Sequence, residues 1–181
     1  GFLAQGRAWT VFAKEAAVLG EADRSMAGIL RDLRKELSGA DLGRIEEAQA
    51  LMDRILAWVA RERADIDRLR TADATLCTWK VNRMAAFLKG DELGEPFLEL
   101  AKELKKDKAF TAAAKAEELV RAMWAEAWSM NLAREPEAAR NNKSYLARIK
   151  RIEAQLNGII EAVPEAAVAG TAQRMLAAYG F

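Results

Sequence analysis

The chain has 181 residues, 51% of them hydrophobic, and its 28 Lys and Arg nearly cancel its 27 Asp and Glu. Balanced charge excludes a global attraction to nucleic acid or anionic membranes, and the absence of histidine excludes His-based general bases, Ser-His-Asp triads and ordinary catalytic zinc sites. The hydrophobic content is that of a folded protein, so we expect one all-α domain over residues 1–181.

The first predicted element is a long helix over residues 2–37. Apolar residues recur seven positions apart, and this register continues through Gly20. Since a loop has no reason to preserve a heptad register, the pattern favours one helix, while two helices broken at Gly20 remain the alternative. The residues that form this seam include Phe2, Trp9, Phe12, Leu19, Met26, Leu30, Leu33 and Leu37.

A second long helix is predicted over residues 42–89, after a turn at residues 38–41 in which Asp41 is a candidate N-cap. Neither Gly nor Pro occurs from Arg44 to Lys89, and a second heptad seam includes Ile45 and Ile66. Several weak capping residues allow a kink or a break near residues 71–75. The two segments together predict an antiparallel hairpin over residues 2–89.

Shorter helices are predicted after a loop at residues 90–95. No alternating β-branched run or hairpin turn signal occurs, so the fold class is an antiparallel helical bundle with about five to six helices, the longest of them coiled-coil-like. The later helices are expected at about residues 96–106, 110–134 and 146–163, with a last amphipathic piece running to the C-terminus.

Three of the five tryptophans, Trp79, Trp124 and Trp128, form the candidate ligand pocket. The last two are four residues apart and therefore share a helix face. Tryptophan commonly fills core space opposite small residues, and it also lines ligand-binding interiors and interaction hot spots. The sequence is compatible with core packing and with a pocket for an apolar or aromatic ligand.

The best candidate for binding an anionic partner is a basic stretch without acidic residues between Ala138 and Ile152. On a helix its charges would lie opposite an apolar stripe, so they could face a phosphate backbone or an anionic lipid surface. A solvated surface of an ordinary helix is the simpler interpretation. The five cationic residues are Arg140, Lys143, Arg148, Lys150 and Arg151.

No catalytic residue, metal site or cofactor is predicted. Asp91, Glu92 and Glu95 lie in the predicted loop, but their spacing does not match a calcium-binding loop, and a solvated acidic turn accounts for them. The lone cysteine, Cys77, excludes an intrachain disulfide and lacks an identifiable activating base, so we expect a small buried or half-buried residue.

The favoured function is a non-enzymatic protein-interaction or assembly protein. We expect a homodimer or a component of a larger assembly with a protein partner, because two long heptad-patterned helices would leave seam surface exposed. A helical small-molecule sensor and an accessory protein for nucleic acid or anionic surfaces remain the alternatives. No apolar run is long enough to span a membrane and no signal peptide is evident, so a cytoplasmic location is expected, although a leader could precede Gly1.

Overall fold

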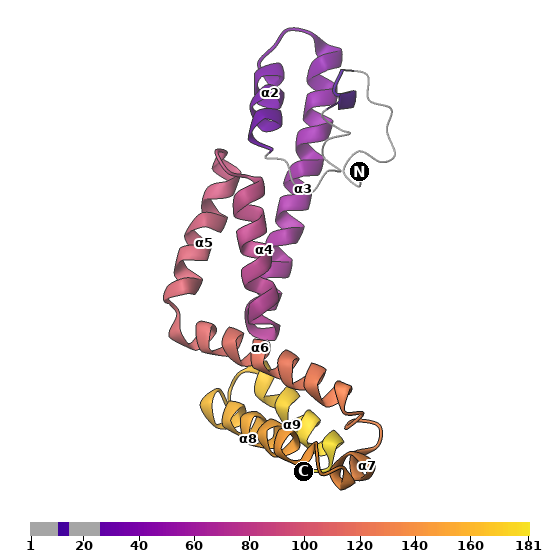
Figure 1. Cartoon of the computed structure of the whole chain (residues 1–181). Helices are drawn as coiled ribbons and strands as arrows, with labels where there is room; N and C mark the ends of the chain where they lie inside the picture. Colours follow the sequence, from indigo (N-terminus) through magenta and orange to yellow (C-terminus); the bar gives the residue numbers. More distant parts are fainter. Residues whose placement is uncertain (1–10, 15–25) are drawn as a thin grey trace. The chain divides into compact units, whose positions relative to one another are not determined.

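The computed structural model describes residues 11–14 and 26–181, and these residues form helices and no strand. The predicted all-α class is confirmed. The described part contains eight α-helices instead of five to six, together with one short 3-10 helix (Figure 1). They are α2 (Ala27–Leu37), α3 (Leu42–Ala72), α4 (Ala74–Phe87), η2 (Glu92–Gly94), α5 (Glu95–Lys106), α6 (Lys108–Ser129), α7 (Pro136–Asn141), α8 (Leu146–Ala162) and α9 (Ala167–Tyr179).

The chain divides into two compact units, and the division falls within helices. The first unit comprises Gly1–Asp67 and Trp79–Lys102, and the second comprises Arg68–Thr78 and Glu103–Phe181. Both α3 and α4 therefore contribute residues to each unit, whereas the predicted loop near residue 90 lies inside the first unit.

In the first unit, the helix predicted over residues 2–37 does not continue unbroken. Helix α2 begins at Ala27, and the backbone N–H of Met26 donates to the carbonyl of Phe87 at 2.9 Å, which is not a helical hydrogen bond. Helix α2 therefore begins beside a tertiary hydrogen bond, and Gly20 lies outside the described residues. The turn before α3 is as predicted, since Asp41 accepts a hydrogen bond from the Arg44 N–H at 3.2 Å.

The break considered near residues 71–75 is confirmed at Asp73, between α3 and α4. The Asp73 N–H still donates to Leu69 and the Asp73 carbonyl still accepts from Cys77, both at 2.9 Å. Its carboxylate also accepts from the Leu76 N–H at 2.8 Å. Asp73 therefore acts as the N-cap of α4 and ends the helix predicted over residues 42–89.

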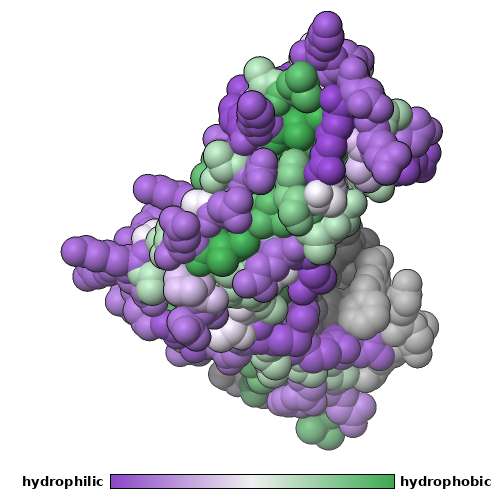
Figure 2. Space-filling view, turned by 90° about the horizontal axis from the view of Figure 1, so that it is seen from below, coloured by the Kyte–Doolittle hydropathy of each residue, from purple (hydrophilic) through white to green (hydrophobic). Residues whose placement is uncertain are grey.

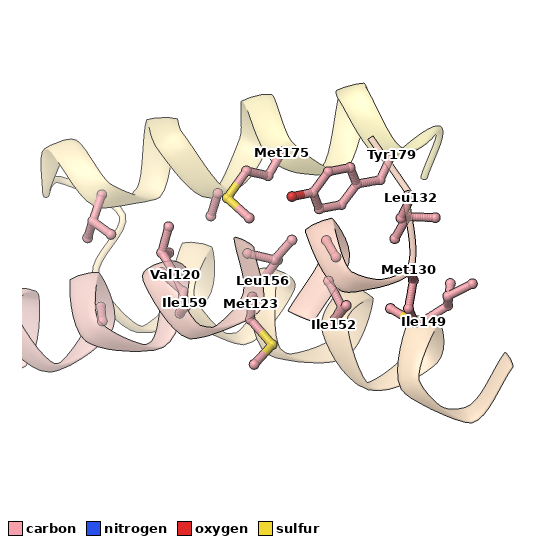
Figure 3. Packing of buried hydrophobic residues seen from close by; sticks show 14 of the residues in the cluster. Val120, Met123, Met130, Leu132, Ile149, Ile152, Leu156, Ile159, Met175 and Tyr179 are labelled. Carbon is pink, nitrogen blue, oxygen red and sulfur yellow. The ribbon is translucent and has the colours of Figure 1, made fainter. Parts of the chain in front are cut away.

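The core of the second unit lies among α6, α8 and α9, with α7 beside α8 (Figure 3). Helix α6 contributes buried residues at steps of four, three and four, the spacing that gives a helix one apolar side. The buried core residues are Ala116, Val120, Met123, Ala127, Met130, Leu132, Ala139, Ile149, Ile152, Leu156, Ile159, Val168, Ala172, Met175 and Tyr179.

Helix α6 ends earlier than predicted, and a further helix follows it. Asn131 adopts a positive φ of 55°, a conformation that asparagine tolerates better than most residues, and the Leu132 N–H donates to Ala127 at 3.0 Å. The helix predicted to Arg134 therefore stops at Ser129. Pro136 then begins α7, which the sequence analysis missed, because six residues are too few for a periodic pattern.

Candidate functional site

The tryptophans proposed as a ligand pocket are surface residues. Trp124 and Trp128 are 53% and 54% exposed, and Trp79 in the first unit is 52% exposed. The rings of Trp124 and Trp128 stack with centroids 5.5 Å apart and planes 23° apart. The prediction that these tryptophans fill core space is therefore wrong. Their exposure also does not fit an enclosed, Trp-lined interior.

A positively charged side chain accompanies each of two tryptophans. The Arg134 guanidinium lies over the Trp128 ring at 4.9 Å, and the Arg83 guanidinium lies over the Trp79 ring at 5.1 Å. Such cation–π contacts contribute modestly at exposed sites and hold both partners in place. The stacked pair with Arg134 is thus an ordered aromatic surface.

Helix phase explains why the pair is exposed. Trp124 and Trp128 each follow a buried core residue, Met123 and Ala127, by one position. One position is about 100° of rotation around an α-helix, so both rings lie on the side of α6 next to its core face. Glu117 and Arg121 belong to the same row by spacing. We call Glu117, Arg121, Trp124 and Trp128 the tryptophan flank of α6.

The first half of the tryptophan flank is covered by the junction between α3 and α4. The two carboxylate oxygens of Glu117 accept hydrogen bonds from the N–H groups of Ala74 and Thr75, each at 2.8 Å. A carboxylate at this position satisfies free N–H groups at the start of α4 and interacts favourably with the helix dipole. Glu117 thus attaches α6 to the start of α4.

Arg121 and Asp73 form the next contact along the flank. One guanidinium nitrogen donates to both carboxylate oxygens of Asp73 at 3.1 Å. Burial alone would raise the pKa of Asp73, but hydrogen bonding to the Leu76 N–H and to the Glu117 side chain, together with Arg121, lowers the pKa below its ordinary value. Asp73 is therefore held ionised at the junction.

A small open pocket of about 170 Å³ lies beside this ion pair. Residues of α9 complete its wall, among them Thr171, whose hydroxyl accepts a hydrogen bond from Arg174 at 3.0 Å. The pocket mixes charged and apolar side chains and contains no nucleophile paired with a base. Its lining residues are Ala72, Asp73, Glu117, Val120, Arg121, Ala167, Val168 and Thr171.

The predicted basic stretch is largely bound within the second unit. Arg148 and Arg151 donate to the same oxygen of Glu126 at 2.8 and 2.5 Å, and Arg148 also donates to the Ser129 hydroxyl at 3.0 Å. Both arginines, with Arg151 contributing most, lower the pKa of the Glu126 carboxyl below its ordinary value. Since Glu126 is two positions from each tryptophan, about 200° of rotation, these contacts lie on the opposite side of α6.

The remaining cations of the stretch divide into one bound and two exposed residues. Arg140 donates to the carbonyls of Tyr179 and Gly180 at 2.7 and 2.6 Å, at the end of α9. A cation at a helix C-terminus satisfies its carbonyls and interacts favourably with the dipole. Lys143 and Lys150 are exposed. The five residues therefore do not act as one free basic surface.

The prediction of a solvated acidic turn is wrong for Asp91, whose carboxylate is buried in an ion pair, whereas Glu92 and Glu95 are exposed. The Asp91 side chain is only 4% exposed and binds the Arg34 guanidinium through both oxygens. Arg34 lowers the pKa of Asp91, with a further contribution from the Leu93 N–H. Glu92 also binds Arg34, at 2.9 Å. These contacts with Arg34 attach the loop to α2, so the acidic residues Asp91 and Glu92 have a structural role.

Among the described residues, no group of three or more His, Cys, Asp or Glu side chains could hold a metal ion. Cys77 is buried, as expected. No helix in the described part of the chain is long and apolar enough to cross a membrane.

On the face seen in Figure 2, hydrophobic residues form patches bordered by hydrophilic ones.

Comparison with known proteins gives no relative: no protein-family model matches the chain, and no curated protein or solved structure matches it.

Proposed function

We propose that the chain is a non-enzymatic protein-interaction module that binds its partner through Trp124 and Trp128. The observation that carries the proposal is a stacked tryptophan pair, more than half exposed, on a helix whose adjacent face is anchored in a core. Tryptophan is enriched among the residues that dominate binding energy at protein interfaces. A rigid pair loses little conformational entropy on binding.

The exposed area is large enough to matter energetically. Covering the exposed halves of two tryptophan side chains, roughly 200 Å² together, would contribute about 5 kcal/mol before the costs of association. Two such rings could therefore form the centre of an interface, with surrounding contacts excluding water. Isolated exposed apolar residues need no such explanation, but an ordered pair of the largest side chains does.

The alternatives receive less support from the same residues. A sensor that encloses a ligand would need buried rings, whereas these rings are open to solvent. Binding of nucleic acid or anionic surfaces through residues 140–151 would compete with the contacts of Arg140, Arg148 and Arg151 within the second unit. Homodimerisation remains one form of the proposed interaction.

Crosslinking from the tryptophan side of α6 tests the proposal. A photoreactive residue replacing the exposed Ala125 should crosslink a protein partner or a second copy. The binding affinity of that partner, once purified, should fall about tenfold or more for Trp124→Ala and for Trp128→Ala. Trp79→Ala is the matched control, because Trp79 is equally exposed and also lies beneath an arginine.

The outcomes separate clearly. An affinity that is lost with Trp128→Ala and kept with Trp79→Ala supports the proposal. Equal affinity for all three variants would overturn it. Light scattering identifies a second copy as the partner if the mass exceeds that of the 20.0 kDa chain and returns to it with Trp124→Ala.

A further inference from the structure

The turn that follows α6, residues 130–135, begins with a defined helix cap. The Asn131 N–H donates to the Trp128 carbonyl at 3.0 Å. The Leu132 N–H donates to the Ala127 carbonyl, also at 3.0 Å. These two bonds, with a positive φ at Asn131, are the pattern of the Schellman motif. The backbone of Trp128 is therefore part of this cap, and we call residues 130–135 the α6–α7 turn.

The α6–α7 turn is fixed to the core of the second unit. Met130 and Leu132 are both buried in the core cluster (Figure 3). The Asn131 carbonyl accepts hydrogen bonds from the N–H groups of Arg134 and Glu135 at 3.1 and 2.9 Å. Since these bonds connect Arg134 to a segment with buried side chains, its backbone has a fixed position relative to α6.

Arg134 completes a stack that the two tryptophans begin. Its guanidinium lies over the Trp128 ring at 4.9 Å, and Trp128 stacks on Trp124 with centroids 5.5 Å apart. Trp124 lies about one helical turn before Trp128, whereas Arg134 comes from the turn after it. In the described part of the chain Arg134 pairs with no carboxylate, unlike Arg148 and Arg151, so the ring contact is what orders its guanidinium.

The backbone conformation of Asn131 makes this contact possible. Asn131 is the only residue other than glycine with a positive φ in the part of the chain that the structure describes. Its φ of 55° reverses the chain direction after α6, and this conformation is unfavourable for most residues but less so for asparagine. Unfavourable backbone conformations cluster at functional sites.

We infer that Arg134 and Asn131 are positioning residues of the interaction site, with Asn131 turning the chain back and Arg134 holding the stacked tryptophans in the arrangement that a partner meets. The inference rests on the proposed function and adds how the site is preorganised. A surface that already has its bound conformation loses less entropy on binding, so its affinity is higher. A cation–π contact at an exposed site contributes modestly, which suits positioning better than a main role in binding.

Two measurements on the full chain test the role of Arg134. Two stacked indole rings give an exciton couplet in circular dichroism, which reports the stack without any partner. Arg134→Ala should weaken this couplet and lower the affinity for the purified partner about two- to fivefold, the equivalent of one exposed cation–π contact. Arg134→Lys keeps a cation and should restore part of both signals. Arg83→Ala removes the matching contact over Trp79 and should change neither.

Two substitutions at Asn131 separate the backbone from the side chain. Glycine adopts a positive φ readily, whereas a β-branched residue does not. Asn131→Gly should therefore keep the couplet and the affinity, and Asn131→Val should weaken both. Thermal unfolding must first show that each variant is folded, and Arg134→Ala still tests the inference if Asn131→Val does not fold.

The outcomes separate this inference from the proposed function. Unchanged affinity of Arg134→Ala overturns the inference, but leaves the proposed function standing if Trp128→Ala still loses binding. Reduced affinity of Arg134→Ala with an unchanged couplet means that Arg134 contacts the partner directly, which also overturns positioning. Loss of the couplet in Asn131→Gly removes Asn131 from the inference. Normal binding by Trp128→Ala overturns the inference and the proposed function together.

Discussion

The basic stretch around α8 and the tryptophan flank of α6 differ in how available their side chains are for binding a partner. In each region, the availability is the reverse of what the residue types suggest. Charged side chains are usually free to bind partners from solvent, yet Arg140, Arg148 and Arg151 bind acceptors within the second unit, although the Arg148 and Arg151 side chains stay 40% and 58% exposed. Tryptophan is usually largely buried, yet Trp124 and Trp128 are half exposed. The difference teaches that a partner at the right position, rather than residue type, decides whether a side chain is available for binding.

The largest expected effect concerns the core side of α6 and α8. Ile152→Ala removes a fully buried side chain and should lower the free energy of unfolding by about 3 kcal/mol, through lost burial and a cavity. Denaturant unfolding measures it. Leu146→Ala, on the same helix but 42% exposed, is the control and should change stability much less. Equal effects would mean that α8 does not pack as described.

A smaller effect is expected where α3 meets α4. Glu117→Ala removes the carboxylate that caps α4 and should cost about 1 kcal/mol of unfolding free energy, a value typical of a lost helix cap. Thermal unfolding followed by circular dichroism measures it. The neighbouring exposed Glu118 provides a control, Glu118→Ala, which should leave the melting temperature nearly unchanged. If Glu117→Ala and Glu118→Ala lowered the melting temperature equally, Glu117 would not act as the cap of α4.

The bound arginines of the basic stretch lead to a pH-dependent prediction. Because Arg151 and Arg148 lower the pKa of Glu126, the ionised carboxylate stabilises the fold above its ordinary pKa of about 4.5, and this stabilisation is lost as the pH falls through and below that value. Glu126→Gln should therefore cost about 1 kcal/mol at neutral pH, allowing for solvent screening of the exposed guanidinium groups, and almost nothing in acid.

Urea unfolding at neutral and acidic pH measures this difference. Lys143→Gln is the control, because Lys143 is exposed and is not among the Glu126 contacts. If the Glu126→Gln variant and the parent chain lost stability in parallel on acidification, the ion pairs between Glu126 and the two arginines would not stabilise the fold.

The smallest effect on stability is expected on the tryptophan flank. Trp124→Ala and Trp128→Ala should each change the unfolding free energy by about 1 kcal/mol or less, because half of each ring is already in solvent. Chemical denaturation checks this, with Ile152→Ala as the reference for a core position. A loss as large as that of Ile152→Ala would place the rings in the core and remove the basis of the proposed interaction.

Much of the secondary structure could be predicted from local pattern. The predicted turn at residues 38–41, the loop after residue 89 and the helices near residues 96–106 and 146–163 agree with the structure to within a few residues. Gly90 has a φ of 87°, and a Cβ at Gly94 would clash with the Leu88 carbonyl oxygen, which shows why glycine marks this loop. Such signals are local, so they survive without knowledge of the fold.

Several features that the sequence did not predict depend on contacts between distant residues. The start of α2 at Ala27 involves the bond from Met26 to Phe87, and the junction at Asp73 is capped from α6 by Glu117. The role of Asp91 required Arg34, which is 57 positions away. No periodicity in a single segment contains these pairings.

The sequence by itself determined that the chain is helical and where most helices end, because apolar spacing, glycine and proline act over one or two turns. It also identified the two tryptophans and the basic stretch as unusual. Only the tertiary structure decided their roles, since a difference of one helical position, about 100°, separates the buried Met123 and Ala127 from the exposed Trp124 and Trp128. Which side of a helix meets a neighbour is a property of packing between segments.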